Sequence, residues 1–154
     1  MAGGPLDQSE AYDRLRTVTR AIVDTGPIVA FLNMRDPHHQ RAQKTLSSFT
    51  LPLVTCEAVL SEACFLVRHA TGRQHAVLAL VSLGIVAVEF RLSSEFEAVS
   101  KLMAKYANVP MALADACLVR MTELDSRARV ITLDSGFRVY RRNGRQAVPV
   151  IMPN

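Results

Sequence analysis

Short apolar segments rich in Val, Ile and Leu alternate with longer segments of helical pattern along most of the chain, and this alternation restricts the fold more than any other feature. The apolar segments are short and β-branched, as buried strands are. Strands that alternate with helices join into a parallel sheet covered by helices on both faces. We therefore expect an α/β fold. The predicted strands are 20–25, 51–56, 85–90, 128–134 and 147–152.

The segments between the predicted strands carry the boundary residues of helices. Gly26 and Pro27 end the first strand, and we expect Pro27 at the first helical position with Thr25 or Gly26 near the N-cap. Asp36 is expected to cap the next helix. Residues 135–144 are expected to form a short helix or turn. The predicted helices are 27–34, 36–49, 57–70, 73–84, 93–107 and 110–124.

The chain has 154 residues, of which 49% are hydrophobic, so it is large enough for one domain with a core. Residues 1–20 begin with a polar segment that contains Gly and Pro, so we expect an N-terminal extension, with a helical turn or two near its end, before one domain at 21–154. Its start lacks the apolar segment of a secretory signal, and no apolar run approaches the length of a membrane span. Cys56, Cys64 and Cys117 stand in apolar surroundings, which favours buried free thiols in a reducing cytoplasm.

The formal net charge is +4, which is compatible with a nucleic-acid partner without requiring one. Aromatic residues make up 6% of the chain and Trp is absent, so we do not expect base stacking to dominate any nucleic-acid contact. Arginines gather after the fourth predicted strand, where they are expected to contact phosphates, although a solvated basic turn is an equal alternative. These are Arg138, Arg141, Arg142 and Arg145.

Four acidic residues stand where a carboxylate needs an explanation. Asp24 ends the first predicted strand and Asp134 ends the fourth, so both lie at the sheet edge where ligands of α/β proteins gather. Glu62 and Asp115 lie on helices and have only apolar residues three and four positions away. A cap, a turn or a local hydrogen bond accounts for each acid alone. The four together indicate an all-oxygen site for Mg²⁺ or Mn²⁺ that is suited to phosphoryl chemistry.

Other chemistries fit the sequence less well. The Asp-Thr-Gly at residues 24–26 is the tripeptide of aspartic proteases, but here it joins a strand to a helix and has no second copy. A phospho-aspartate phosphatase needs a second Asp two residues later, where this chain has Gly26. The sequence contains neither a GxGxxG motif nor a P-loop, and its histidines lack zinc-ligand spacing with the cysteines.

Four segments, IVDTGPIVAFLNMRDPHH, LVTCEAVLSEACFLV, LADACLVRMTE and VITLDSGF, resemble the PIN domain family, in particular its VapC-like toxin ribonucleases. The resemblance extends from about Ala21 to the C-terminus, and the N-terminal extension departs from the family pattern. It implies a Rossmann-like, three-layer α/β/α fold with a parallel sheet of four to five strands. It also implies an endoribonuclease that depends on Mg²⁺ or Mn²⁺ and serves as the toxin of a type II toxin–antitoxin pair.

The family's acids fall on Asp24, Glu62, Asp115 and Asp134, which are therefore the expected catalytic and metal-binding residues. Thr25 is expected near the metal and the RNA. The resemblance further implies an RNA substrate, an antitoxin partner, a homodimer and a cytoplasmic location away from membranes. Two alternatives stay open: a PIN nuclease of RNA processing or of structured DNA, and a PIN module that binds RNA or protein without cutting.

Overall fold

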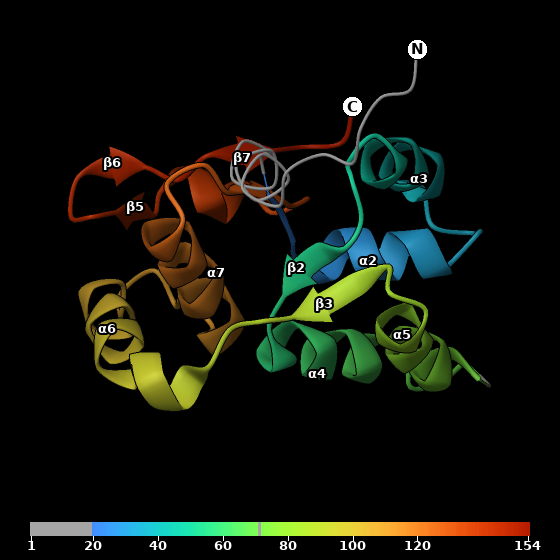
Figure 1. The fold of residues 1–154 in the computed structure, drawn as a ribbon, viewed down its shortest axis with the longest axis horizontal. Coiled ribbons are helices and arrows are strands. Elements are labelled where there is room, and N and C mark those ends of the chain that lie inside the picture. The colour runs from blue at the N-terminus through green and yellow to red at the C-terminus, as the bar shows by residue number, and fades with distance from the viewer. Residues whose placement is uncertain (1–19, 71) are drawn as a thin grey trace, which may run out of the picture.

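Five parallel strands form the central sheet in the computed structural model, which describes residues 20–70 and 72–154 (Figure 1). The expected helical turns of the N-terminal extension lie outside the described residues. The strands are β1 (Ala21–Val23), β2 (Leu53–Thr55), β3 (Val86–Val88), β4 (Arg129–Ile131) and β7 (Val150–Ile151). Their spatial order is β3-β2-β1-β4-β7, so the chain builds the sheet outward from β1 in both directions. The predicted α/β class and the parallel sheet are confirmed.

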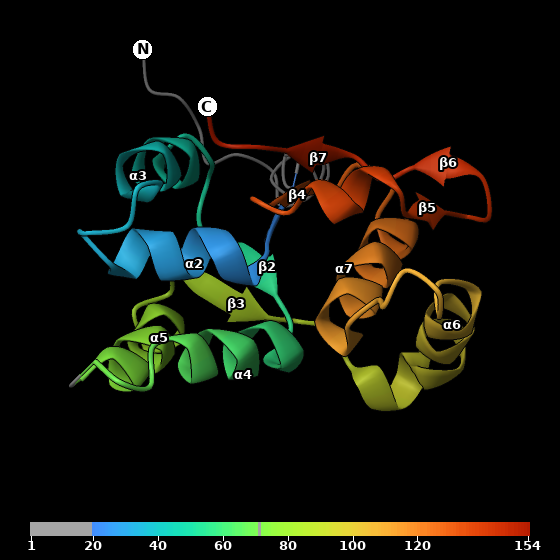
Figure 2. The ribbon, with the colours of Figure 1, turned by 180° about the vertical axis from the view of Figure 1, so that it is seen from behind.

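Helices cover both faces of this sheet. Successive residues of a strand point to opposite faces, so each strand packs against helices on both sides. Val23 and Leu53 line an apolar cavity with residues of the helices α2, α3 and α5, whereas Ile22 and Val54 line another with residues of α7. Figure 2 shows α2 to α5 in one half of the molecule and α6 and α7 in the other. The helices are α2 (Thr25–Leu32), α3 (His39–Ser47), α4 (Glu57–Leu66), α5 (Arg73–Ser82), α6 (Leu92–Lys105) and α7 (Leu113–Leu124).

Strand β1 passes directly into α2, and Asp24 is the N-cap of that helix. The Asp24 carboxylate accepts a hydrogen bond from the backbone N–H of Thr25 at 2.7 Å. We expected the cap at Thr25 or Gly26 and Pro27 at the first helical position, but the helix begins earlier and Pro27 occupies its third position. Proline is tolerated there because the N–H groups of the first turn have no partner within the helix.

Two other helices begin later than the sequence predicts. Asp36 does not cap α3, because its carboxylate accepts the backbone N–H of His38 at 2.8 Å in a turn that precedes the helix. Helix α7 begins at Leu113 and not near Pro110, since the backbone is still extended at Ala112. A turn therefore precedes α3, and an extended residue precedes α7.

The C-terminal segment is more divided than the sequence predicts. A short 3-10 helix, η1 (Ser135–Arg138), is followed by an antiparallel hairpin of β5 (Arg141–Arg142) and β6 (Gln146–Ala147). Asn143 and Gly144 have φ angles of 49° and 84°, and such left-handed pairs suit a tight hairpin turn. The predicted strand at 147–152 is confirmed only at β7, which joins the sheet. Its start at Ala147 belongs to the hairpin instead.

The thiols lie largely in the interior, as expected. Cys56 and Cys117 are buried, Cys64 is half-buried, and all three are free. None of the helices in the described part of the chain combines the length and apolar character needed to cross a membrane.

Candidate active site

The four predicted acids come together at the carboxyl edge of the sheet. Strands β1 and β4 pair directly, so Asp24, after β1, lies beside the segment that carries Asp134. Glu62 comes from the middle of α4 and Asp115 from the first turn of α7. Burial is the main cause that raises the pKa of Asp24 and of Asp115. The charges of Asp115 and Glu62 add to the rise at Asp24, and those of Asp134 and Glu62 add to the rise at Asp115. The four carboxyl groups therefore share one electrostatic environment.

Asp24 is the most buried of the four, with 5% of its surface exposed. Its Oδ1 accepts the N–H of Thr25 at 2.7 Å, and its Oδ2 accepts the hydroxyl of Thr132 at 2.7 Å. Burial raises the pKa of Asp24 to about 6, while these two hydrogen bonds oppose that rise. The side chain is thus fixed at both oxygens and costly to ionise.

Thr132 joins the two acids at the strand ends and was not among the residues predicted from sequence. Its side chain is fully buried. Its hydroxyl donates to Asp24 and accepts the backbone N–H of Asp134 at 2.9 Å. The one sequence signal is weak: a hydroxyl residue stands two positions before an acid at a strand end, where threonine is common anyway.

Asp115 is held by one backbone group and one side chain. Its Oδ2 accepts the N–H of Ala112 at 3.1 Å and the hydroxyl of Tyr140 at 3.2 Å. Burial is the main reason that the pKa of Asp115 is raised. The Tyr140 ring is itself fixed by edge-to-face packing on Tyr106 and Phe137, with ring centroids 5.1 and 5.4 Å away. Tyr140 is a second residue that the sequence pattern did not reveal.

Glu62 and Asp134 lie on the outer side of the group. Glu62 is partly exposed and accepts the hydroxyl of Thr25 at 2.9 Å. Asp134 is exposed and accepts the N–H of Gly136 at 2.8 Å, which caps η1. Each of the four acids therefore has a hydrogen-bond donor of its own.

The donor set fits a hard divalent cation, because it consists of carboxylate and hydroxyl oxygens. No ion pair within residues 20–70 and 72–154 involves any of the four acids. In the same part of the chain, no three His, Cys, Asp or Glu side chains surround one point closely enough to bind an ion. Since like charges repel, a cation would have to draw the carboxylates inward, and the partly exposed Glu62 and the exposed Asp134 are less enclosed than Asp24.

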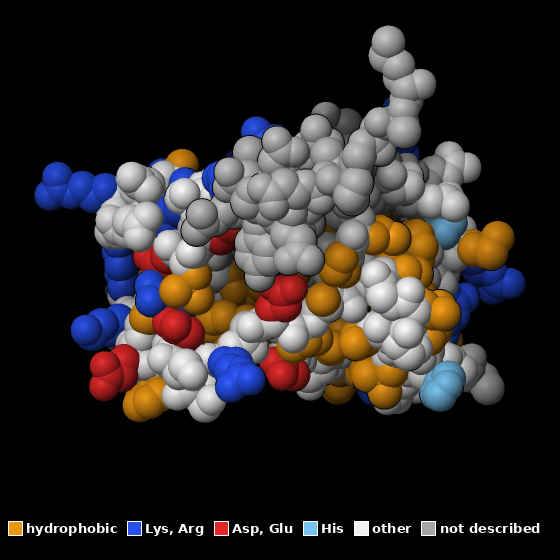
Figure 3. Space-filling model, in the orientation of Figure 1, with side chains coloured by type: hydrophobic (Ala, Val, Ile, Leu, Met, Phe, Trp, Pro, Cys, Tyr) orange, Lys and Arg blue, Asp and Glu red, His pale blue; other side chains and the backbone are white. Residues whose placement is uncertain are grey.

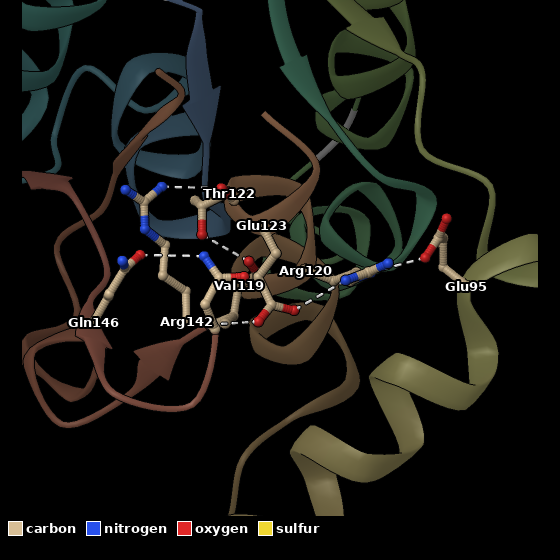
Figure 4. Close-up of polar contacts among 8 residues, drawn as sticks. Glu95, Val119, Arg120, Thr122, Glu123, Arg142 and Gln146 are labelled. Carbon is tan, nitrogen blue, oxygen red and sulfur yellow. Dashed lines mark hydrogen bonds and ion pairs between the residues drawn. The ribbon is translucent and has the colours of Figure 1, made fainter. Parts of the chain in front are cut away.

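Two of the arginines predicted to bind RNA also hold the backbone in place. Arg142 donates to the carbonyl oxygens of Thr122 at 2.9 Å and Ser126 at 3.3 Å, at the end of α7. Figure 4 shows this guanidinium group beside α7. Arg141 donates to three carbonyl groups of residues 138–140. One nitrogen of each side chain, Nη1, therefore bonds within the fold.

Arg138 and Arg145 are the more exposed members of the predicted RNA-binding set. Arg138 contacts the sulfur of Met152 at 3.4 Å. Figure 3 shows Lys and Arg side chains gathered at the edge of the molecule where α6, β5 and β6 lie. The segment that carries the four arginines directly follows Asp134 in the chain.

Comparison with known proteins identifies the class to which this fold and site belong. The model of the PIN domain family matches residues 21–143, and the chain therefore belongs to the PIN domain family. Among individual relatives, the chain is 25% identical over 115 residues to ribonuclease VapC26 of Mycobacterium tuberculosis, covering 73% of this chain and 85% of that protein.

A solved structure confirms the fold. The crystal structure of Mycobacterium tuberculosis VapC20, described as a sarcin-ricin loop cleaving toxin, superposes with a TM-score of 0.67. The match covers 75% of this chain and 90% of that one, at 20% sequence identity. The predicted three-layer, PIN-like α/β/α arrangement is thus confirmed, as is the predicted membership of the PIN domain family.

Proposed function

We propose that this protein is an endoribonuclease that requires Mg²⁺ or Mn²⁺ and hydrolyses RNA phosphodiester bonds. The main support is the meeting of four carboxylates from four separate segments, with no cationic partner among the described residues. A relative named a ribonuclease and a structural neighbour described as a toxin support the same class.

Asp24, Glu62 and Asp115 would hold the ion, with Asp134 at the outer edge. A divalent ion bound there offsets the charge that develops on the phosphate and lowers the pKa of the attacking water. The hydrogen bonds to Asp24 and Asp115 fix the two carboxylates in orientation, and ionised carboxylate oxygens keep further lone pairs for a ligand. Thr25, which we expected near the metal and the RNA, would act by orienting Glu62.

The basic edge would position the RNA backbone. Arg138 and Arg145 are exposed and follow the acids in the chain, so phosphates on either side of the cleaved bond can reach them. Arg141 and Arg142 would contribute mainly by shaping the segment that carries them. Such contacts add affinity without reading sequence.

The same comparisons support a cellular role. We propose that the protein is the toxin of a type II toxin–antitoxin pair, that it acts as a homodimer, and that a cognate antitoxin protein neutralises it. An acidic segment of that antitoxin would compete with RNA for the basic edge. Co-expression with the product of a neighbouring short gene, followed by purification of a stable complex, tests this role.

The enzymatic proposal is tested by incubating the protein with defined tRNAs and mRNAs in Mg²⁺, Mn²⁺ or EDTA and mapping the new ends. We expect cleavage only with a divalent ion, leaving a 5′-phosphate and a 3′-hydroxyl. D24N should be inactive, whereas D36N, which changes a turn carboxylate in the same way, should remain active. Binding without cleavage would instead support a non-cutting PIN module, and cleavage confined to structured DNA would support the other nuclease class.

A further inference from the structure

Helix α4 presents a bare apolar surface immediately beyond Glu62. Phe65 and Leu66, one turn later, are 60% and 57% exposed. Ser61, Glu62, Phe65 and Leu66 line one shallow depression on the surface. Along the helix axis, about 5 Å separates Glu62 from these two apolar side chains. An exposed aromatic ring therefore lies within one nucleotide's reach of a proposed metal ligand.

The exposed ring is part of a stacked pair. The guanidinium carbon of Arg68 lies 3.7 Å from the centroid of the Phe65 ring. The same guanidinium group donates to the carbonyl oxygen of Phe65 at 2.6 Å, which holds it over the ring. Aromatic rings and arginine planes are the two side-chain surfaces on which unpaired nucleobases stack.

The surface continues away from the acids and becomes basic. Leu66 also lines a second depression, together with Asn33 at the end of α2, His69 after α4, and Arg73 at the start of α5. Figure 2 shows α2 and α4 running alongside each other. From residue 63 to residue 88 the sequence contains no Asp or Glu, while it contains Arg68 and Arg73. A polyanion therefore meets no fixed negative charge from this segment once it has passed Glu62.

We propose that Phe65, Leu66, Arg68 and Arg73, together the α4 platform, bind an unpaired nucleotide next to the phosphate that is cut. The base stacks on the Phe65–Arg68 pair against Leu66, and the following phosphate contacts Arg73. This inference rests on the proposed ribonuclease function. Phosphate contacts still provide most of the affinity, in line with the low aromatic content, and the single stack selects single-stranded RNA.

Binding can be measured without cleavage in the D24N background. The probe is a short single-stranded oligoribonucleotide of randomised sequence with one internal 2-aminopurine, whose fluorescence is quenched on stacking. F65A should weaken binding by about tenfold or more and abolish the quenching. F65Y should retain both. F96A is the matched control, because Phe96 on α6 is 59% exposed and lies outside both depressions, and it should change neither.

The outcomes separate this inference from the proposed function. If F65A binds and quenches like its D24N parent, the α4 platform is wrong, whatever the wild-type protein cleaves. If wild type cuts no RNA but quenching still depends on Phe65, the ribonuclease proposal fails and the platform stands. If F65A leaves RNA binding intact and instead breaks a homodimer in light scattering, the surface is a protein interface and the platform is overturned.

Discussion

Asp24 and Glu62 belong to one group of acids but lie in contrasting surroundings. Asp24 is buried at the strand edge, with both oxygens hydrogen-bonded, and it is tied through Thr132 to the segment of Asp134. Glu62 makes one side-chain hydrogen bond and lies on a helix whose next turn, at Phe65, faces solvent. The site thus has a fixed side, formed by Asp24 and its partner Thr132, and an open side, formed by Glu62 and the exposed turn that follows it. We infer that the fixed side serves the chemistry and that the open side admits the RNA.

The two helices that carry acids show the same contrast. Helix α7 is buried over most of its length and is anchored by Arg120, which pairs with Glu95 of α6 at 2.8 Å (Figure 4). Helix α4 buries three residues and exposes the turn after Glu62. Substitutions should therefore differ in kind: those of the acids and of the residues that fix them alter catalysis, and those on the exposed turn after Glu62 alter RNA binding alone.

The largest effect should come from removing the charge of the fixed side. D24N should lower the initial rate of RNA cleavage by about a thousandfold or more, because the ion loses its most firmly held ligand. The rate is measured with saturating Mg²⁺ beside D36N as control. If D24N and D36N cleaved at similar rates, Asp24 would have no part in catalysis. The inference that the fixed side serves the chemistry would then be wrong.

The same variant should make the ion-free protein more stable above pH 6. The pKa of Asp24 rises from 3.8 to about 6 on folding, so the folded state holds the proton more tightly. The stability of wild type therefore falls as the pH rises from about 4 to about 6, and it stays lower above that. D24N does not undergo this loss, which is up to about 3 kcal/mol in the free energy of unfolding.

Thermal unfolding in EDTA measures this difference. D24N should melt several degrees above wild type at pH 8, and the two should converge near pH 4. Mn²⁺ should raise the melting temperature of wild type and leave that of D24N nearly unchanged. Equal melting temperatures at pH 8 would show that the Asp24 carboxylate is not costly to ionise, contrary to its burial.

A smaller effect is expected at the link between the strand ends. T132V keeps the shape of the side chain but removes the hydroxyl that joins Asp24 to the backbone of Asp134. Cleavage should slow by about ten- to hundredfold, with a higher Mn²⁺ requirement. T132S should restore most of the rate, and failure of this rescue would mean that the methyl group and not the hydroxyl matters.

The smallest effect is expected at Tyr140. Y140F removes the hydroxyl that donates to Asp115 but keeps the ring that packs on Tyr106 and Phe137. We expect a loss of activity of about tenfold or less, without a change in melting temperature beyond about one degree. A large drop in melting temperature would show that the Tyr140 hydroxyl stabilises the fold and does not act in the active site.

The sequence was sufficient for the sheet and the family. It also singled out the four acids, whose roles stay a prediction, but it did not reveal the residues that contact those acids. Glu62 and Asp115 are recognisable because a carboxylate among apolar residues conflicts with its neighbours, and Asp24 and Asp134 because each ends a predicted strand. Thr132 and Tyr140 cause no such conflict, since threonine suits a strand end and tyrosine suits a core. Their roles depend on the pairing of β1 with β4 and on the return of the chain after η1.

The boundaries of the elements were predicted less well for a similar reason. The sequence predicts Asp36 as a helix cap, yet the same carboxylate serves equally well in a turn, and packing decides between them. The hairpin of β5 and β6 has too few residues for a pattern of alternation, and only Asn143–Gly144 indicates it.

The most direct test of the account is the rate of RNA cleavage followed across a Mn²⁺ titration for wild type and D24N. We predict no cleavage in EDTA, saturable activation of wild type, and no measurable activation of D24N over the same range. Cleavage by wild type at an unchanged rate in EDTA, or identical activation curves for the two proteins, would contradict the claim that these acids form a metal-dependent ribonuclease site.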